Sequence, residues 1–142
     1  MAGRLIVFEG TDGSGKSTQF ALARQALEAA GRDFRTFVYP QYQEESSALL
    51  RMYLSGQFGT HPSDVNAYAA STFFAVDRYA GYKRFWGAYY ERGGLMVLDR
   101  YTTSNAVHQS SKLTPPEREK FFRWLADFEY GILGLPAPDL VL

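Results

Sequence analysis

Residues 10–17 read Gly-Thr-Asp-Gly-Ser-Gly-Lys-Ser, which fits the pattern G-x-x-x-x-G-K-[ST]. A short, mainly apolar run at residues 5–9 precedes this segment, and apolar residues at helical spacing follow it over residues 17–30. Strand, glycine-rich loop and helix in this order are the context in which the pattern forms a phosphate-binding loop, or P-loop. A buried strand that leads directly into a helix is typical of a parallel sheet, so the motif predicts an α/β architecture.

The residue types of this loop indicate how it would hold an anion. Glycines let the backbone curl so that several N–H groups point at one phosphate, and the following helix adds its positive end. We expect Lys16 to reach the β- and γ-phosphates of ATP and the Ser17 hydroxyl to ligate Mg²⁺. The residues assigned to the ATP phosphates are Gly10, Thr11, Asp12, Gly13, Ser14, Gly15, Lys16, Ser17 and Thr18. The motif indicates nucleotide binding and leaves the reaction open.

Strand-like and helix-like segments alternate along the rest of the chain. Further strands are expected at residues 34–39, 95–98 and 139–142, and helices at 46–55, 64–92, after Asp99 and at 115–130. Asp64 is the expected N-cap of the long helix. The order predicts one domain over residues 1–142, a parallel β-sheet with helices on both faces. Because ligands bind at the carboxyl ends of such strands, one shared site is expected to include residues 9–18, 39–42 and 99–109.

Composition excludes several classes of function. Fifteen basic residues balance fifteen acidic ones, so no global field attracts a nucleic acid polymer. The chain has no cysteine, which excludes disulfides and Cys-based zinc sites and suggests a reducing cytoplasm. No apolar run approaches the roughly 20 residues that span a membrane, and no signal peptide is visible. We therefore expect a cytoplasmic protein that holds anionic ligands through local donors.

A second cluster of polar residues follows the strand at 95–98. Asp99 stands where a Walker-B carboxylate would reach Mg²⁺, directly or through water. Arg100 follows it and can bind a phosphate group bidentately. The alternative is that Asp99 caps a helix and Arg100 is solvated. A second phosphate group near the P-loop is the hypothesis that these two residues favour.

The long predicted helix carries Phe74, Asp77 and Arg78 on one face, because positions i, i+3 and i+4 lie together. Phe74 offers a flat surface for stacking and Arg78 offers a donor to a base edge. This interpretation holds only if the face meets the P-loop. Otherwise Phe74 is a core residue.

Together these segments resemble the thymidylate kinase family, and they follow the family's order. The matching segments are residues 8–19, 39–42, 74–78, 99–105 and 134–140. The resemblance covers nearly the whole chain and is far more specific than the P-loop alone. It implies a P-loop NTPase fold of the nucleoside monophosphate kinase type, transfer of a phosphoryl group from ATP to dTMP with Mg²⁺, and a homodimer.

The resemblance also implies roles for individual residues. Phe74 would stack on thymine and Arg78 would hydrogen-bond to its O4 atom. Arg100 and Tyr42 would hold the acceptor phosphate. The full implied set for dTMP is Asp12, Tyr39, Tyr42, Phe74, Arg78, Arg100, Ser104, Asn105 and His108, with Asp12, Lys16 and Arg100 catalytic and Ser17 and Asp99 at the metal.

Within that set, three residues would surround the sugar. Asp12 would contact the 3′-hydroxyl or the metal region. Asn105 would line the base and sugar pocket together with Ser104. His108 falls where the family has a residue that screens the 2′ position.

The chain departs from the family pattern near residue 40. Gln41 and Tyr42 stand where an Arg commonly follows a Phe-Pro pair, so one phosphate-binding cation is missing, and Tyr39 replaces the usual Phe. The P-loop carries no Arg, and family members of that kind place the catalytic Arg in a lid after the next strand. The chain ends at Leu142, so we expect it to be the N-terminal two-thirds of the enzyme. Without the lid and the last helices it would be weakly active or inactive.

Two other functions stay open. A deoxynucleoside kinase of the P-loop class would need a general base, for which Glu9 is the candidate, although a structural or metal-linked role suits Glu9 better. A non-catalytic nucleotide-binding module would explain the missing lid and the lack of an Arg in residues 39–42. The aromatic residues Phe85, Trp86, Tyr89 and Tyr90 are expected in the core or on a dimer surface.

Overall fold

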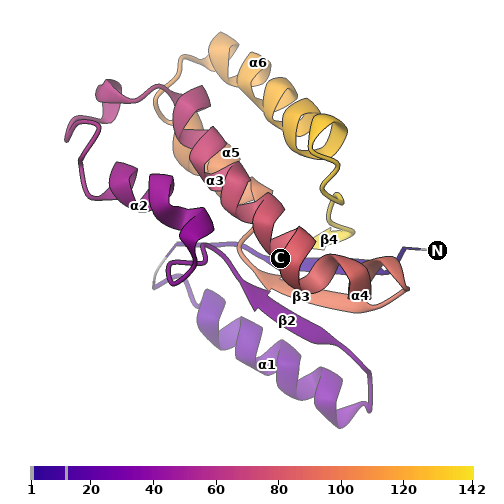
Figure 1. The fold of residues 1–142 in the computed structure, drawn as a ribbon. Helices are drawn as coiled ribbons and strands as arrows, with labels where there is room; N and C mark the ends of the chain where they lie inside the picture. The colour runs from indigo at the N-terminus through magenta and orange to yellow at the C-terminus, as the bar shows by residue number, and fades with distance from the viewer. Residues whose placement is uncertain (1, 12) are drawn as a thin grey trace.

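The computed structural model describes residues 2–11 and 13–142. Parallel strands form one four-stranded sheet in the order β2-β3-β1-β4 (Figure 1). The strands are β1 (Arg4–Phe8), β2 (Arg35–Val38), β3 (Leu95–Asp99) and β4 (Leu140–Val141). Side chains alternate along β1, so that Leu5 and Val7 face one core while Ile6 and Phe8 face another. The parallel sheet predicted from the sequence is therefore confirmed.

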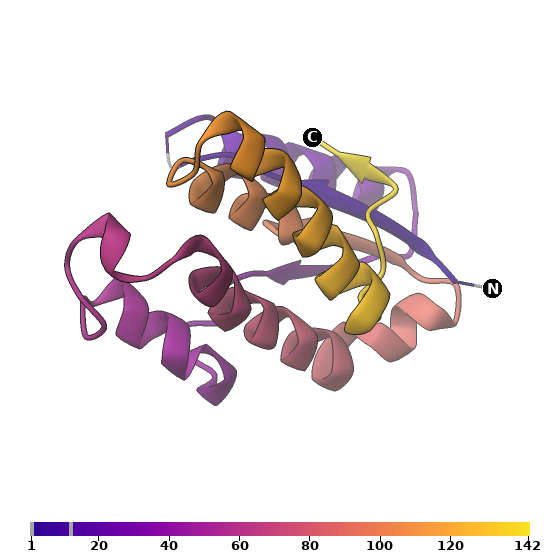
Figure 2. The ribbon, with the colours of Figure 1, turned by 90° about the horizontal axis from the view of Figure 1, so that it is seen from above.

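Helices cover both faces of the sheet. On one face lies α1 (Lys16–Ala29) (Figure 1). Its residue Phe20 packs against Phe8 and Val97. The opposite face carries the larger helical layer, in which α6 crosses above α5 (Figure 2). That layer contains η1 (Glu45–Ser47), α2 (Ala48–Leu54), η2 (Pro62–Asp64), α3 (Ala67–Gly81), η3 (Tyr82–Trp86), α4 (Gly87–Glu91), α5 (Thr102–Ser110), α6 (Pro115–Ala126) and η4 (Asp127–Ile132).

The strand register determines where the functional segments meet. Phe8 at the end of β1 pairs with Asp99, and Val38 at the end of β2 also pairs with Asp99. Three neighbouring strands therefore end at one level. The P-loop, the segment after β2 and the segment after β3 leave the sheet at the same edge, as the sequence predicted.

The prediction of one long helix with Asp64 as its N-cap was wrong at its start. The helix begins at Ala67, and Asn66 is the N-cap because its side chain accepts the Ala69 N–H at 2.9 Å. Asp64 belongs to the 3₁₀ turn η2, where it accepts the His61 N–H at 2.9 Å. Asn and Asp are equally good N-cap residues, so the sequence alone could not show whether the helix begins after Asp64 or after Asn66.

The two longest predicted helices also change their winding. The first continues from α3 through η3 into α4, and η3 is π-helical. The second predicted helix ends as α6 at Ala126 and continues as the π-helical η4. A π-helical segment of a single turn is too short to alter the helical spacing of apolar residues noticeably, so the sequence pattern does not reveal it.

The aromatic stretch after α3 divides between core and surface. Trp86, Tyr89 and Tyr90 are buried in the core that includes Leu5 and Val7 of β1. Phe85, by contrast, is 44% exposed. Over residues 2–11 and 13–142, none of the helices has the length and apolar character needed to cross a bilayer.

Candidate functional site

The P-loop leads from β1 into α1. Gly15 precedes α1 with a φ of 88°, a conformation that residues with a Cβ rarely adopt. The loop borders an open hollow of about 460 Å³. Its lining residues are Thr11, Gly13, Gly15, Lys16, Ser17 and Thr18. Asp12, predicted to contact both substrates and to act in catalysis, lies outside the described residues.

Lys16 forms an ion pair with Asp99, and both side chains are largely buried. The pair links the P-loop to the end of β3, so the structure brings the predicted phosphate-binding Lys and the predicted metal-binding carboxylate together. Ser17, the next residue, is exposed. A hydroxyl and a carboxylate oxygen are ligands suited to Mg²⁺, which usually completes its shell with water and phosphate oxygens. The described residues contain no cluster of three or more His, Cys, Asp or Glu that could hold a metal ion.

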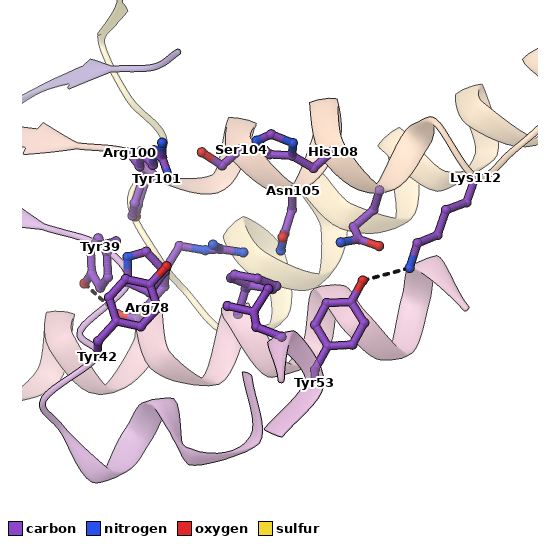
Figure 3. A pocket seen from close by; sticks show the side chains of 14 residues that line it. Tyr39, Tyr42, Tyr53, Arg78, Arg100, Tyr101, Ser104, Asn105, His108 and Lys112 are labelled. Carbon is purple, nitrogen blue, oxygen red and sulfur yellow. Dashed lines mark hydrogen bonds between the residues drawn. The ribbon is translucent and has the colours of Figure 1, made fainter. Parts of the chain in front are cut away.

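Arg100 has an unusual backbone conformation. Its φ of 68° lies in the left-handed region, which is rare outside glycine and concentrates at functional sites. The Arg100 N–H donates to the Phe8 carbonyl at 2.8 Å, which ties the residue to the end of β1. Its side chain borders the second cavity of the site (Figure 3).

We call this second cavity, of about 340 Å³, the acceptor cavity, because the sequence predicts the phosphate acceptor there. It lies between α5 on one side and α3, α2 and the segment after β2 on the other (Figure 3). It is lined by Tyr39, Pro40, Tyr42, Tyr53, Leu54, Phe74, Arg78, Arg100, Tyr101, Ser104, Asn105, His108, Gln109 and Lys112. Aromatic walls with a few polar groups, at this volume, suit a ligand of nucleotide size. Every described residue predicted to contact dTMP lines this cavity.

A hollow of about 220 Å³ connects the P-loop with the acceptor cavity. It shares Thr11 with the P-loop hollow, and it shares Ser104 and His108 with the acceptor cavity. The three spaces therefore form a row. Ligands bound at its two ends would point their nearest groups at each other.

Phe74 and Arg78 point from α3 into the acceptor cavity. The Phe74 ring is partly buried and meets Tyr53 edge-on, at 6.3 Å between ring centroids, and it is not part of the main hydrophobic core. Arg78 is only 3% exposed, and its Nε donates to Glu129 Oε1 at 2.5 Å. Two residues of the predicted helix face, Phe74 and Arg78, thus line the cavity, whereas Asp77 is hydrogen-bonded to Gln41.

The segment after β2 is anchored to α3. Asp77 accepts the backbone N–H of Gln41 at 2.9 Å and its side-chain amide at 3.1 Å. The hydroxyl of Tyr39 donates to the Arg78 carbonyl and accepts from Trp86 Nε1, both at 2.9 Å. Gln41 therefore has a structural role, because it ties this segment to α3. The hydroxyl of Tyr39 is used in these two hydrogen bonds, so its ring is the part that can contact a ligand in the cavity. Tyr42 is 52% exposed at the edge of the cavity.

Glu9 joins β1 to the start of α5. Its Oε2 accepts from Tyr101 N–H at 3.1 Å, Thr103 Oγ1 at 2.6 Å and Ser104 N–H at 3.1 Å. Its Oε1 accepts from Ser104 Oγ at 2.7 Å. A carboxylate with four donors caps the helix and is held in a structural role.

Several cavity residues were not predicted from the sequence. Gln109 lies one turn beyond Asn105 on α5, so the i+4 spacing was an available signal. Lys112 lies past the end of that helix and donates to Tyr53 Oη at 3.0 Å and to the Val65 carbonyl at 2.9 Å. Glu129, the partner of Arg78, does not line the cavity, and no local pattern in the sequence marks it.

Comparison with known proteins identifies the family of the chain. The family model described as thymidylate kinase matches residues 8–142. The chain belongs to the thymidylate kinase family. The thymidylate kinase of Mycobacterium tuberculosis is 36% identical to it over 137 residues, and that of Homo sapiens is 33% identical over 141 residues. The Candida albicans thymidylate kinase structure, at 24% identity and a TM-score of 0.65, has the same fold over 99% of this chain and 61% of its own.

The match covers part of these thymidylate kinases. It includes 95% of this chain and 62% of the Mycobacterium tuberculosis protein, and 99% of this chain and 59% of the human protein. The chain therefore spans less than two thirds of the length of these two thymidylate kinases.

Proposed function

We propose that the protein carrying this chain transfers the γ-phosphoryl group of ATP to dTMP, giving ADP and dTDP. The supporting observation is the row of spaces that runs from the P-loop hollow to the acceptor cavity. A triphosphate cradled around Lys16 and a monophosphate beside Arg100 would meet in the middle of this row. Membership of the thymidylate kinase family supports the same assignment.

In this proposal the acceptor cavity holds dTMP. Phe74 stacks on the thymine, and Arg78 donates to its O4 atom. Ser104, Asn105 and His108 line the cavity from α5, where they would contact the base and sugar. Tyr42 joins Arg100 at the phosphate, and Asp12 would act near the 3′-hydroxyl.

The chemistry needs alignment more than proton transfer. The second pKa of a phosphate ester is about 6, so the attacking oxygen of dTMP is already ionised at neutral pH. Lys16 would exchange its contact with Asp99 for the β- and γ-phosphates, and Arg100 would hold the acceptor phosphate in line. Ser17 and Asp99 would hold Mg²⁺, which would supply charge neutralisation when bound.

The competing hypothesis of a deoxynucleoside kinase loses support at Glu9. A general base must be within reach of the 5′-hydroxyl and able to take its proton. Both oxygens of Glu9 accept hydrogen bonds that cap α5. The acceptor is therefore proposed to be a monophosphate.

The test is an assay of purified protein with MgATP and either dTMP or thymidine. We expect ADP and dTDP to form from dTMP and no product from thymidine. Lys16→Met is the control, since loss of the P-loop cation should abolish transfer while the acceptor cavity stays intact. Phosphorylation of thymidine, with dTMP inert, would contradict the proposal. Binding of both nucleotides without any transfer would instead favour the nucleotide-binding module.

We also propose a homodimer and a cytoplasmic location. Val76 and Tyr79 lie three residues apart on α3 and are 45% and 39% exposed, which supports an apolar contact with a second copy. Light scattering coupled to size exclusion should give the mass of a dimer. Val76→Glu should shift that mass to the monomer, and a monomeric wild type would contradict the first proposal.

A further inference from the structure

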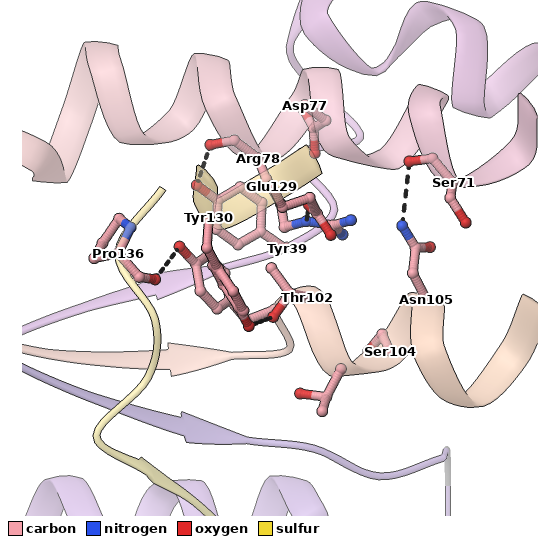
Figure 4. A network of polar contacts seen from close by, with 12 residues as sticks. Tyr39, Ser71, Asp77, Arg78, Thr102, Ser104, Asn105, Glu129, Tyr130 and Pro136 are labelled. Carbon is pink, nitrogen blue, oxygen red and sulfur yellow. Dashed lines mark hydrogen bonds and ion pairs between the residues drawn. The ribbon is translucent and has the colours of Figure 1, made fainter. Parts of the chain in front are cut away.

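Glu129 is a buried carboxylate outside the segments that meet at the sheet edge. It lies in the π-helical turn η4, is fully buried and contacts Arg78 through a single 2.5 Å bond to Nε (Figure 4). The backbone of the turn is fixed as well, because the Glu129 carbonyl accepts the Leu135 N–H at 3.0 Å. Glu129 is therefore held in place and, in turn, holds Arg78.

The geometry of this pair is incomplete for a structural ion pair. Arginine and a carboxylate usually form two parallel hydrogen bonds. Here Arg78 Nη2 and Glu129 Oε2 are buried, and neither has a hydrogen-bond partner among residues 2–11 and 13–142. The guanidinium extends into the acceptor cavity toward Asn105 (Figure 3). A buried donor without a partner costs free energy, so an acceptor from a ligand would complete it.

The pair is also poorly suited to stabilising the fold. Burial raises the pKa of the Glu129 carboxyl above its ordinary value, and Arg78 offsets only part of that rise. Buried ion pairs often contribute no net stability, because removing two charges from water costs as much as their attraction returns. A role in orienting a functional group explains the pair better.

We propose that Glu129 is a positioning residue that holds Arg78 by Nε so that Nη2 faces the base in the acceptor cavity as a fixed donor. The proposal rests on the function proposed above. Arginine has donors and no acceptor. A keto oxygen at position 4 of the pyrimidine would satisfy Nη2, whereas the amino group of cytosine would place donor against donor. Glu129 would thereby sharpen the preference for dTMP over dCMP without touching either nucleotide.

The test compares Glu129→Gln with wild type in the full-length protein. Gln keeps the shape and an oxygen near Nε, and it removes the charge. Calorimetry should show dTMP binding about tenfold weaker, dCMP binding little changed, and ATP binding unchanged. The ratio of dTMP to dCMP affinity should therefore shrink. Glu119→Gln removes the same charge from an exposed position on α6 and should change none of these values.

A second comparison separates positioning from folding. In an Arg78→Gln background, Glu129→Gln should have no further effect on dTMP affinity, because its target is already gone. If Glu129→Gln fails to fold, Glu129→Asp keeps the charge and shortens the reach, and it should also reduce the dTMP to dCMP ratio. An unchanged ratio in a folded Glu129 variant would overturn the inference, as would a parallel loss of dTMP, dCMP and ATP binding. A wild type that binds no dTMP would instead refute the proposed function.

Discussion

Arg100 combines a disfavoured backbone conformation with a place beside the acceptor cavity. Its left-handed φ follows from the abrupt exit of the chain from β3, where the Arg100 N–H bonds to the Phe8 carbonyl. A strained backbone conformation of this kind persists only where contacts with the surrounding structure hold it in place. The backbone conformation of Arg100 therefore costs stability while it directs toward the cavity the side chain that we propose binds phosphate.

Two substitutions at Arg100 should separate these effects. Arg100→Gly and Arg100→Ala both remove the guanidinium, but only glycine adopts a positive φ without strain. We expect Arg100→Gly to be more stable than Arg100→Ala by about 1 kcal/mol. Both variants should lose most dTMP affinity while they retain ATP. Urea unfolding and calorimetry measure the two quantities, and equal stability of the two variants would show that the backbone here is unstrained.

Glu129 should make the stability of the protein depend on pH. Its pKa is raised by burial, so folding favours the protonated carboxyl. The stabilising contribution of that carboxyl is then complete below its unfolded pKa and is lost as pH rises through the folded value. We expect the free energy of unfolding of wild type to fall, relative to Glu129→Gln, over the pH range that begins at the ordinary carboxyl pKa of 4.5 and extends upward. Denaturant titrations across this range measure the difference, and parallel curves for both proteins would contradict the expectation.

At the scale of elements, α3 and the segment after β2 form one unit beside the cavity. The Asp77 carboxylate accepts from Gln41 and, at 2.6 Å, from Ser46 Oγ. Near the end of α3, Gly81 allows the helix to approach closely. A Cβ at this position would lie 2.5 Å from Tyr39 Oη and 2.9 Å from Gln41 Nε2. Glycine is therefore needed here for packing, although it is a poor helix former.

Gly81→Ala should consequently destabilise the fold despite its better helix propensity. We expect a loss of about 1–3 kcal/mol, because the added methyl displaces Tyr39 and Gln41 from their hydrogen bonds. Thermal and urea unfolding provide the measurement. Lys83→Ala, at an exposed position two residues further along, should change stability by less than about 0.5 kcal/mol. If Gly81→Ala were more stable than wild type, the space between α3 and Tyr39 would be large enough for the added methyl group.

At the scale of the whole molecule, the three spaces in a row predict that two nucleotides bind at once. The P-loop hollow and the acceptor cavity share no lining residue, yet each adjoins the connecting hollow. Thymidine and adenosine joined by an oligophosphate chain should therefore occupy the whole row.

This bisubstrate nucleotide should raise the unfolding temperature more than ATP or dTMP alone at equal concentration. A ligand at 100 times its Kd stabilises the folded state by about 2.7 kcal/mol, and linking two ligands lowers the Kd of the pair. Scanning calorimetry makes the comparison, with the Lys16→Met variant as a control that should respond mainly to dTMP. No gain over the better single ligand would show that the two ends cannot be filled together.

Local patterns in the sequence were enough to predict the architecture and to name most of the proposed site residues. The P-loop pattern, the short apolar strands and the helical periodicity are local signals, and each follows from the geometry of one element. Parallel strands end at a common edge, so residues that follow strands could be assigned to one site before their contacts were known. Phe74 and Arg78 could be placed on one helix face in the same way, because residues four positions apart lie together on a helix.

Tertiary structure alone decided what those residues can do. Arg78 depends on Glu129, Gln41 depends on Asp77 and Glu9 depends on the start of α5, each pairing across 36 or more residues. Such pairings produce no periodic pattern in the sequence, because they depend on how separate elements pack together. The face of α3 was therefore predictable, whereas its contact with the cavity, and the carboxylate that fixes Arg78 there, became visible only once α3, α5 and η4 were packed together.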